Sequence, residues 1–471
     1  MARQNGSPDN KRYHIVLIPG FGGFDALGQV EYYTGVTPLF ENWKAGNPNV
    51  ALHYFDNFPT AGVIVRATRL QRYLAQRIAR GEIAPGDEVS LVGHSTGGLD
   101  IRWLIWTLSG NDEGSNSDSH REPIRVDGGS FVHPRDLLKW IRRVVFLSAP
   151  HWGTNIADWV RSYRLSREAV VADLRALVAG SQTFILDQIE EQTTGAAAHL
   201  TDADVLRAVQ DALTEANERY GNRSAIRTLA AHEAASELAL YLRQIASDFH
   251  AIDDLASRRP PGRPVSPAHF DDDERVKELE VWDSKKIKSL SFATLGSRAF
   301  DFSPGSPAPV WELCQLWTYP DVLKGTAVSK GTDLAYRLSY RACAGGPFRK
   351  PRLSGTVTRR MAPCPSDPLE LWDNDGIVNT ISMLWPRGDN VLVACDHLDI
   401  VGHYHLVKAQ RGVGRKYQAY DTLRSTPPFP DKNFTLIWNE IFNFCSGRKG
   451  SPPAARKKAA QRVAPSSASG R

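Results

Sequence analysis

The sequence predicts an α/β fold with a mainly parallel sheet, flanking helices and a large helical insertion. Short apolar runs rich in β-branched residues predict buried strands at residues 13–18, 88–92, 141–147, 290–295 and 390–395. Between the first two runs, residues 62–80 place apolar side chains at helical spacing with arginines among them, which predicts an amphipathic helix. A second helical pattern starts at Leu99, directly after the second strand. Because strands and helices alternate along the chain, we expect parallel strands joined by crossover helices.

The chain of 471 residues suits one large domain with insertions. Residues 155–257 are rich in Ala, Leu and Glu and poor in Gly and Pro, which favours several helices. We therefore expect an α/β domain over residues 1–445, with a helical cap or lid at about 155–285. The last 26 residues, 446–471, hold seven Lys or Arg and no acid, and we expect them to be a disordered basic tail. Without this tail the net charge becomes +5 − 7 = −2, so the basic character belongs to the tail and not to the fold or the site. We expect the tail to be a solvated chain end and expect no nucleic-acid partner, with binding of the tail to an anionic membrane or to nucleic acid as the alternative.

The N-terminal segment bears on the cellular compartment. It becomes apolar only at Ile15, and Pro19-Gly20 interrupts the apolar run before it reaches the length of a signal peptide. No run of about 18 apolar residues occurs, so we expect no membrane span. As written, the chain is expected in the cytoplasm, while an upstream start codon would leave secretion open.

The hexapeptide Gly93-His94-Ser95-Thr96-Gly97-Gly98 lies between a predicted strand and a predicted helix. It contains the pattern G-x-S-x-G, in which a sharp turn lifts the serine hydroxyl clear of the sheet and small residues let strand and helix approach. Ser95 is therefore the expected nucleophile. The N–H of Thr96, at the start of the helix, would face a developing oxyanion. The alternative is a structural glycine-rich turn with an exposed serine.

A glycine-rich loop, Pro19 to Gly23, follows the first predicted strand. In folds with this elbow, a loop after an early strand supplies the second oxyanion donor. We expect this donor to be the backbone N–H of Phe21. A simple turn that ends the strand is the alternative.

A serine nucleophile needs a base, and the base needs an acid that orients it. The expected chain order is serine, acid and then histidine. Asp375 lies in a tight turn, Asn374 to Asn379, where a carboxylate is held rigidly, and it is the expected acid. Asp373 is the rival, and an Asx-turn role for Asp375 is the structural alternative.

Three histidines follow the expected acid: His397, His403 and His405. His397 comes directly after the last apolar run, so it would lie at the carboxyl end of a strand, where parallel sheets bind ligands. It is therefore the expected base. The other two lie farther along the chain, and His403 is the first alternative.

Together these segments resemble the bacterial triacylglycerol lipases of the staphylococcal and Geobacillus type, within the α/β-hydrolase lipases. The matching segments occur in the family's order at residues 93–98, 149–154, 290–294, 374–383 and 396–402. They cover the sheet core but neither the helical insertion nor the tail. The resemblance implies the same acid, Asp375, and the same base, His397. The oxyanion loop reads Pro-Gly-Phe where the family usually has His-Gly-Phe.

The resemblance also bears on metals and on one further histidine. Family members bind calcium through acidic residues around the catalytic histidine. Asp399 matches one such position, whereas Tyr404 stands where another acid is expected. The chemistry itself requires no cofactor. His151 lies in a matching motif, and we expect it to be a structural hydrogen-bonding residue.

We therefore expect serine-dependent hydrolysis of carboxylic esters, lipid esters such as acylglycerols in particular, through an acyl-enzyme. The expected partner is an ester or lipid substrate, and peripheral contact with a lipid surface stays open. The alternatives are a non-lipid esterase, thioesterase or amidase, an acyltransferase with the same three residues, and a non-enzymatic scaffold of the same fold.

Overall fold

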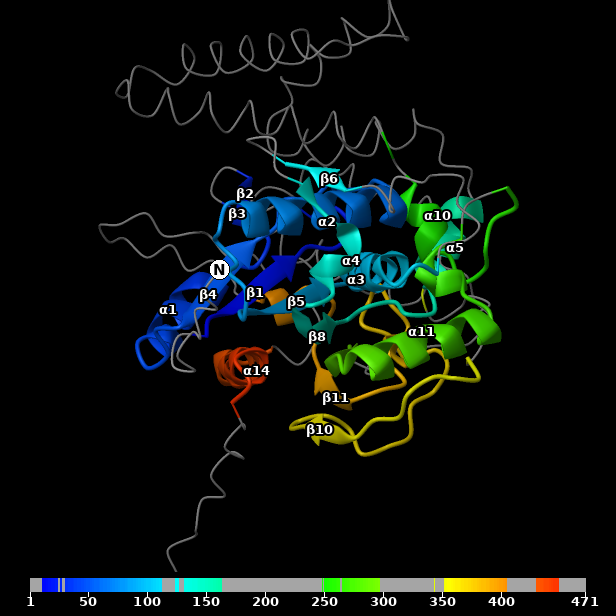
Figure 1. The fold of residues 1–471 in the computed structure, drawn as a ribbon. Coiled ribbons are helices and arrows are strands. Elements are labelled where there is room, and N and C mark those ends of the chain that lie inside the picture. Colours follow the sequence, from blue (N-terminus) through cyan, green and yellow to red (C-terminus); the bar gives the residue numbers. More distant parts are fainter. Residues whose placement is uncertain are drawn as a thin grey trace, which may run out of the picture.

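A seven-stranded parallel sheet forms the centre of the molecule (Figure 1). The computed structural model describes residues 11–23, 26–27, 30–111, 123–126, 131–162, 248, 250–262, 265–296, 343, 351–404 and 429–448. Every strand pair recorded in this sheet is parallel. In spatial order the strands are β10 (Arg359–Met361), β11 (Asp389–Ala394), β9 (Lys288–Leu295), β8 (Ile141–Leu147), β5 (Glu88–His94), β1 (Tyr13–Ile18) and β4 (Val50–Tyr54).

Helices cover both faces of this sheet, as the alternating side chains of β1 show. Ile15 and Leu17 pack in a core with α1 (Val36–Lys44) and α14 (Asp431–Cys445). Val16 and Ile18 point the other way, into a core with α2 (Val63–Ala79), α3 (Thr96–Leu108) and α11 (Asp272–Lys285). A parallel strand between two helical layers is apolar on both faces, which explains the continuous apolar runs in the sequence. The predicted α/β fold with a parallel sheet is therefore confirmed.

Short elements complete the described chain. They are the hairpins β2 (Ala26–Leu27) with β3 (Val30–Glu31) and β6 (Ile124–Arg125) with β7 (Phe131–Val132), the helices α4 (Pro134–Leu137), α5 (Asn155–Ser162) and α10 (Ala251–Leu255), and the 3₁₀ turns η4 (Pro267–His269), η6 (Thr380–Met383) and η7 (Asp399–Val401). Across the described ranges, no helix combines the length and the apolar character needed to cross a membrane.

Most of the expected helical cap, residues 163–247, lies outside the described residues, so the cap stays a prediction. At the end of the expected range, α11 packs against the sheet. Its Trp282 is buried, with the ring centroid 5.8 Å from that of Phe146 on β8. This helix therefore belongs to the crossover between β8 and β9. Of the expected basic tail, only residues 446–448 are described, and they close the end of α14.

Candidate active site

Ser95 occupies a strained turn between β5 and α3. Its backbone angles are φ 53° and ψ −127°, a positive φ that residues other than glycine rarely adopt. The Ser95 N–H donates to the carbonyl of Leu147 on β8 at 2.8 Å, and the Ser95 carbonyl accepts from Gly98 N–H at 2.9 Å. Backbone hydrogen bonds from the sheet and the helix thus hold the serine in this conformation.

The glycines of the motif are required by close backbone contacts. A Cβ on Gly93 would lie 2.6 Å from the carbonyl carbon of Gly97, and a Cβ on Gly97 would lie 2.5 Å from the carbonyl oxygen of Ile18. Real Cβ atoms do not approach other atoms so closely, and these contacts are with backbone that cannot rotate away. The G-x-S-x-G spacing is therefore what lets α3 start against the ends of β1 and β5.

Asp375 and His397 form a buried pair, with 2.7 Å between Asp375 Oδ2 and His397 Nδ1. The pair is also joined through the backbone, since His397 N–H donates to the Asp375 carbonyl at 3.1 Å. The other oxygen, Oδ1, accepts the N–H groups of Ile377 at 3.0 Å and Val378 at 2.8 Å. Thr294 Oγ1 donates to Oδ2 at 2.6 Å. Four donors therefore hold the carboxylate in one orientation.

His397 lies beside the residue that precedes Ser95, at the carboxyl edge of the sheet. The ring of His94, the residue before Ser95, lies 4.7 Å from that of His397 between centroids. His94 Nε2–H also donates to the His397 carbonyl at 2.8 Å. Between these described side chains, Ser95 Oγ makes no hydrogen bond to His397. Such catalytic bonds often tighten only when substrate binds.

The rival acid and base have other partners. Asp373 Oδ2 accepts the N–H of Glu370 at 2.8 Å. His403 Nε2–H donates to the carbonyl of Tyr32 at 2.9 Å, and burial lowers the pKa of its imidazole. His405 lies outside the described residues. The pair that the structure brings together is therefore the expected one.

The predicted oxyanion loop packs directly on Ser95. A Cβ on Gly20 would lie 2.5 Å from Ser95 Cβ, so only glycine fits there. Gly22 N–H donates to the Pro59 carbonyl at 2.7 Å, which ties the far side of the loop to the segment before α2. Phe21, the expected donor, lies between these two anchored glycines. Thr96, the other expected donor, is the first residue of α3, where backbone N–H groups point out of the helix.

Behind this loop lies a buried ion pair that sequence reasoning missed. Arg66 Nη2 and Asp100 Oδ2 are 2.9 Å apart, and both side chains are fully buried. Arg66 also donates to the carbonyls of Pro19 at 2.7 Å and Phe58 at 2.6 Å. Burial raises the pKa of Asp100 to about 6, against the opposing effect of Arg66. The sequence did contain a signal for this ion pair, because Arg66 lies within the apolar stripe of the predicted helix, where a charged side chain needs a partner.

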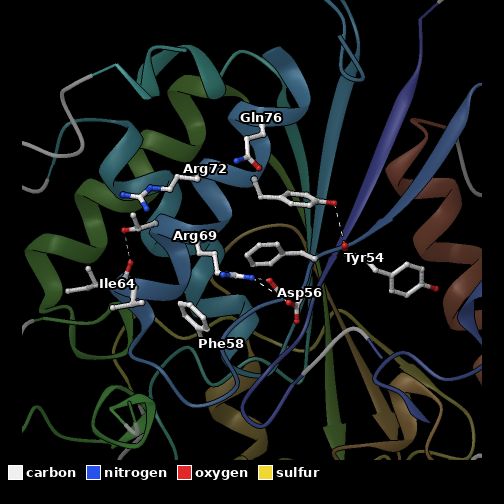
Figure 2. A pocket seen from close by; sticks show the side chains of 11 residues that line it. Tyr54, Asp56, Phe58, Ile64, Arg69, Arg72 and Gln76 are labelled. Atoms are coloured by element: carbon white, nitrogen blue, oxygen red, sulfur yellow. Dashed lines mark hydrogen bonds and ion pairs between the residues drawn. The ribbon is translucent and has the colours of Figure 1, made fainter. Parts of the chain in front are cut away.

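A groove of about 580 Å³ lies between α2 and residues 54–58 (Figure 2). Arg69 lines it, pairing with Asp56 at 3.4 Å while its guanidinium carbon lies 4.5 Å from the centroid of the Phe58 ring. Neither the nucleophile nor the acid–base pair lines the groove, so we assign it no part in the chemistry.

The expected role of His151 as a hydrogen-bonding residue is wrong for its side chain. Neither ring nitrogen has a hydrogen-bond partner within the described structure, and the side chain is fully buried. The ring packs instead against Phe146 and Trp385, with centroids 4.5 and 4.8 Å away. Burial, followed by the charge of Arg102, holds its pKa well below the usual range. Its backbone makes the polar contacts, since the carbonyl accepts from Arg102 at 2.8 Å.

Asp399, the residue that matches a calcium-binding position in the resemblance, makes a local contact. Asp399 Oδ2 accepts the N–H of Asp396 at 3.0 Å, so it closes a local turn. Within the described ranges, no group of three or more His, Cys, Asp or Glu side chains is arranged to hold a metal ion.

Comparison with known proteins gives structural neighbours. No family model matches the chain, and no curated protein sequence matches it. Lipase 1 from Pelosinus fermentans is 16% identical, with a TM-score of 0.42 over 92% of this chain and 98% of that one. EstA from Clostridium botulinum is 17% identical, with a TM-score of 0.39 over 83% and 84%. The Staphylococcus hyicus lipase is 14% identical, with a TM-score of 0.42 over 94% and 97%. At such identities, the chemistry of this site has to follow from its own side chains.

Proposed function

We propose that this chain is a serine hydrolase that cleaves carboxylic esters through an acyl-enzyme. The observation that carries the proposal is the buried Asp375–His397 pair at 2.7 Å. It lies beside the strained turn that presents Ser95. These are the three roles that nucleophilic acyl transfer requires, which are nucleophile, base and orienting acid.

The Asp375–His397 contact supports Nε2 as the base nitrogen of the proposed mechanism. Because His397 Nδ1 faces an oxygen of Asp375, that nitrogen carries the proton, and Nε2 keeps the lone pair that acts as base. Nε2 takes the Ser95 hydroxyl proton while Oγ attacks the ester carbonyl. In the resulting tetrahedral intermediate, the N–H groups of Phe21 and Thr96 would stabilise the oxyanion, each contributing about 3 kcal/mol.

Collapse of the intermediate breaks the ester C–O bond, and the imidazolium of His397 gives its proton to the leaving alcohol. Water then adds to the acyl-enzyme, with His397 again as base. The second collapse releases the carboxylic acid and returns the proton to Ser95. The carboxylate of Asp375 stabilises the imidazolium in both halves of the reaction without taking its proton.

For the substrate, we propose lipid esters of the acylglycerol type. The support is the sequence resemblance of residues 374–383 and 396–402 to bacterial triacylglycerol lipases. These two segments contain the acid and the base, and they are more specific than the elbow motif.

Hydrolysis of p-nitrophenyl esters from acetate to palmitate, by wild type and Ser95→Ala, tests the proposal. Ser90→Ala is the matched control, because it removes another buried hydroxyl of β5, one that donates to the Cys445 carbonyl at 3.0 Å. We expect Ser95→Ala to lower kcat by at least about 10⁴-fold and Ser90→Ala to stay within about tenfold.

Equal activity of wild type and Ser95→Ala would contradict the hydrolase assignment. A preference for long acyl chains would support lipid esters, whereas activity confined to acetate and butyrate would indicate a non-lipid esterase. Ester formation with an added alcohol in place of hydrolysis would indicate an acyltransferase.

A further inference from the structure

Two buried side chains link the base to the oxyanion loop. His94 Nε2 lies 2.8 Å from the His397 carbonyl oxygen, and His94 Nδ1 lies 2.6 Å from the Tyr32 hydroxyl. That hydroxyl lies 2.9 Å from the backbone nitrogen of Gly20. A continuous line of hydrogen bonds thus runs from the base, past the residue before the nucleophile, to the loop that packs on the nucleophile.

The protons along this line have one consistent arrangement. A carbonyl can only accept, so His94 Nε2 carries a hydrogen and donates to His397. Burial, reinforced by His397, holds the pKa of His94 well below its usual value, so the ring is neutral and Nδ1 accepts. The Tyr32 hydroxyl therefore donates to Nδ1, and its oxygen accepts the Gly20 N–H. Every donor along the line faces an acceptor.

Both ends of Tyr32 are fixed. Its hydroxyl belongs to the line just described, while its backbone carbonyl accepts from His403 Nε2 at 2.9 Å. Tyr32 is 6% exposed and His94 is fully buried, so water does not readily replace these bonds. The histidine that sequence reasoning considered as a rival base thus anchors the tyrosine that holds the loop.

The position of Gly20 connects this line to the chemistry. Gly20 lies against Ser95 Cβ, and its carbonyl belongs to the same peptide group as the Phe21 N–H. Holding the Gly20 N–H therefore restrains the orientation of the next peptide, which carries the expected oxyanion donor. At the other end of the line, holding the His397 carbonyl restrains the backbone of the base.

We propose that Tyr32 and His94 are positioning residues, which hold the oxyanion loop and the base in the correct positions relative to Ser95. This inference rests on the proposed function. Tyr32→Phe removes only the hydroxyl that joins His94 to Gly20, so it interrupts the line with the least change in shape.

Tyr33→Phe is the matched control. Tyr33 is the next residue, it is 2% exposed, and its hydroxyl donates to the Ile18 carbonyl at 2.6 Å. It also contacts the backbone of His94, but not the His94 ring through which the line runs. Each variant therefore loses one buried hydroxyl from the same segment. We expect kcat of Tyr32→Phe to fall about 10- to 100-fold with KM within about threefold, since loosening a donor costs less than deleting it. We expect Tyr33→Phe to stay within about threefold for both.

Hydrogen–deuterium exchange of the Gly20 amide in each full-length variant gives a readout that does not depend on activity. We expect exchange to be at least about tenfold faster in Tyr32→Phe and unchanged in Tyr33→Phe. Unchanged Gly20 exchange in Tyr32→Phe would overturn the inference, and so would faster exchange with kcat equal to that of Tyr33→Phe. Failure of the proposed function differs from both, because Ser95→Ala would then retain full activity.

Discussion

Replacing Asp375 by Asn tests the acid–base pair with almost no change in shape. The asparagine oxygen can still accept the N–H groups of Ile377 and Val378, as Oδ1 does now at 3.0 and 2.8 Å. Its NH₂ group then stands where Oδ2 lies, 2.7 Å from His397 Nδ1. Two donors cannot face each other, so the proton of His397 moves to Nε2, and the nitrogen that should act as base is blocked.

The expected loss in kcat is about 10⁴-fold, the magnitude that this tautomer change causes in serine proteases, equivalent to about 5 kcal/mol of activation free energy. The free energy of unfolding should change by only about 1 kcal/mol, because the two backbone bonds to Oδ1 remain and the Thr294 hydroxyl can rotate to accept from the new NH₂ group. The assay is single-turnover hydrolysis of a p-nitrophenyl ester, with urea unfolding of the same samples. Asp373→Asn is the control, a buried carboxylate two residues earlier whose Oδ2 accepts the Glu370 N–H. If Asp375→Asn stayed within tenfold of wild type, or Asp373→Asn lost as much activity, the assignment of the acid would be refuted.

Two further predictions concern the elbow and acid stability. Gly97→Ala should lower both the melting temperature and the activity, because the new Cβ would lie 2.5 Å from the Ile18 carbonyl oxygen. A thermal melt and an ester hydrolysis assay check this, and wild-type values for both would contradict the elbow geometry. Burial lowers the pKa of His269 from 6.5 to about 4, so its contribution to stability is complete above pH 6.5 and is lost as the pH falls toward 4. His269→Gln should therefore reduce the acid-induced loss of unfolding free energy by at most about 3 kcal/mol. Urea unfolding at pH 7 and pH 4 measures this loss, and an equal loss in wild type and His269→Gln would contradict the prediction.

The parts of the fold that the sequence predicted are those with a strong local signal. The central strands β1, β5, β8, β9 and β11 are continuous apolar runs because helices cover both of their faces. The edge strand β4 was missed, since four of its five residues are only half-buried and it includes His53 and Tyr54. Helix α1 was missed because Gly35 and Pro38 near its start resemble loop sequence.

The same distinction holds for the site. The pairing of Asp375 with His397 was predictable because each residue lies in a short segment with its own turn or strand signal, in the chain order that the elbow requires. The contacts around them were not. Tyr32 and His94 are 62 residues apart, and Arg66 and Asp100 are 34 apart. Such pairs can be recognised only once the register of β1 against β5 and the packing of α2 on α3 are known. The role of the His151 side chain was mispredicted because an imidazole usually makes hydrogen bonds, whereas here it packs against the aromatic rings of Phe146 and Trp385.

The central claim is that Ser95 is a nucleophile activated by His397 and Asp375. Labelling of the full-length protein with a fluorophosphonate, followed by peptide mass spectrometry, tests it most directly. We expect one adduct, on the peptide containing Ser95, formed far more slowly in Asp375→Asn. An adduct on a different serine, or equal labelling rates in wild type and Asp375→Asn, would contradict it.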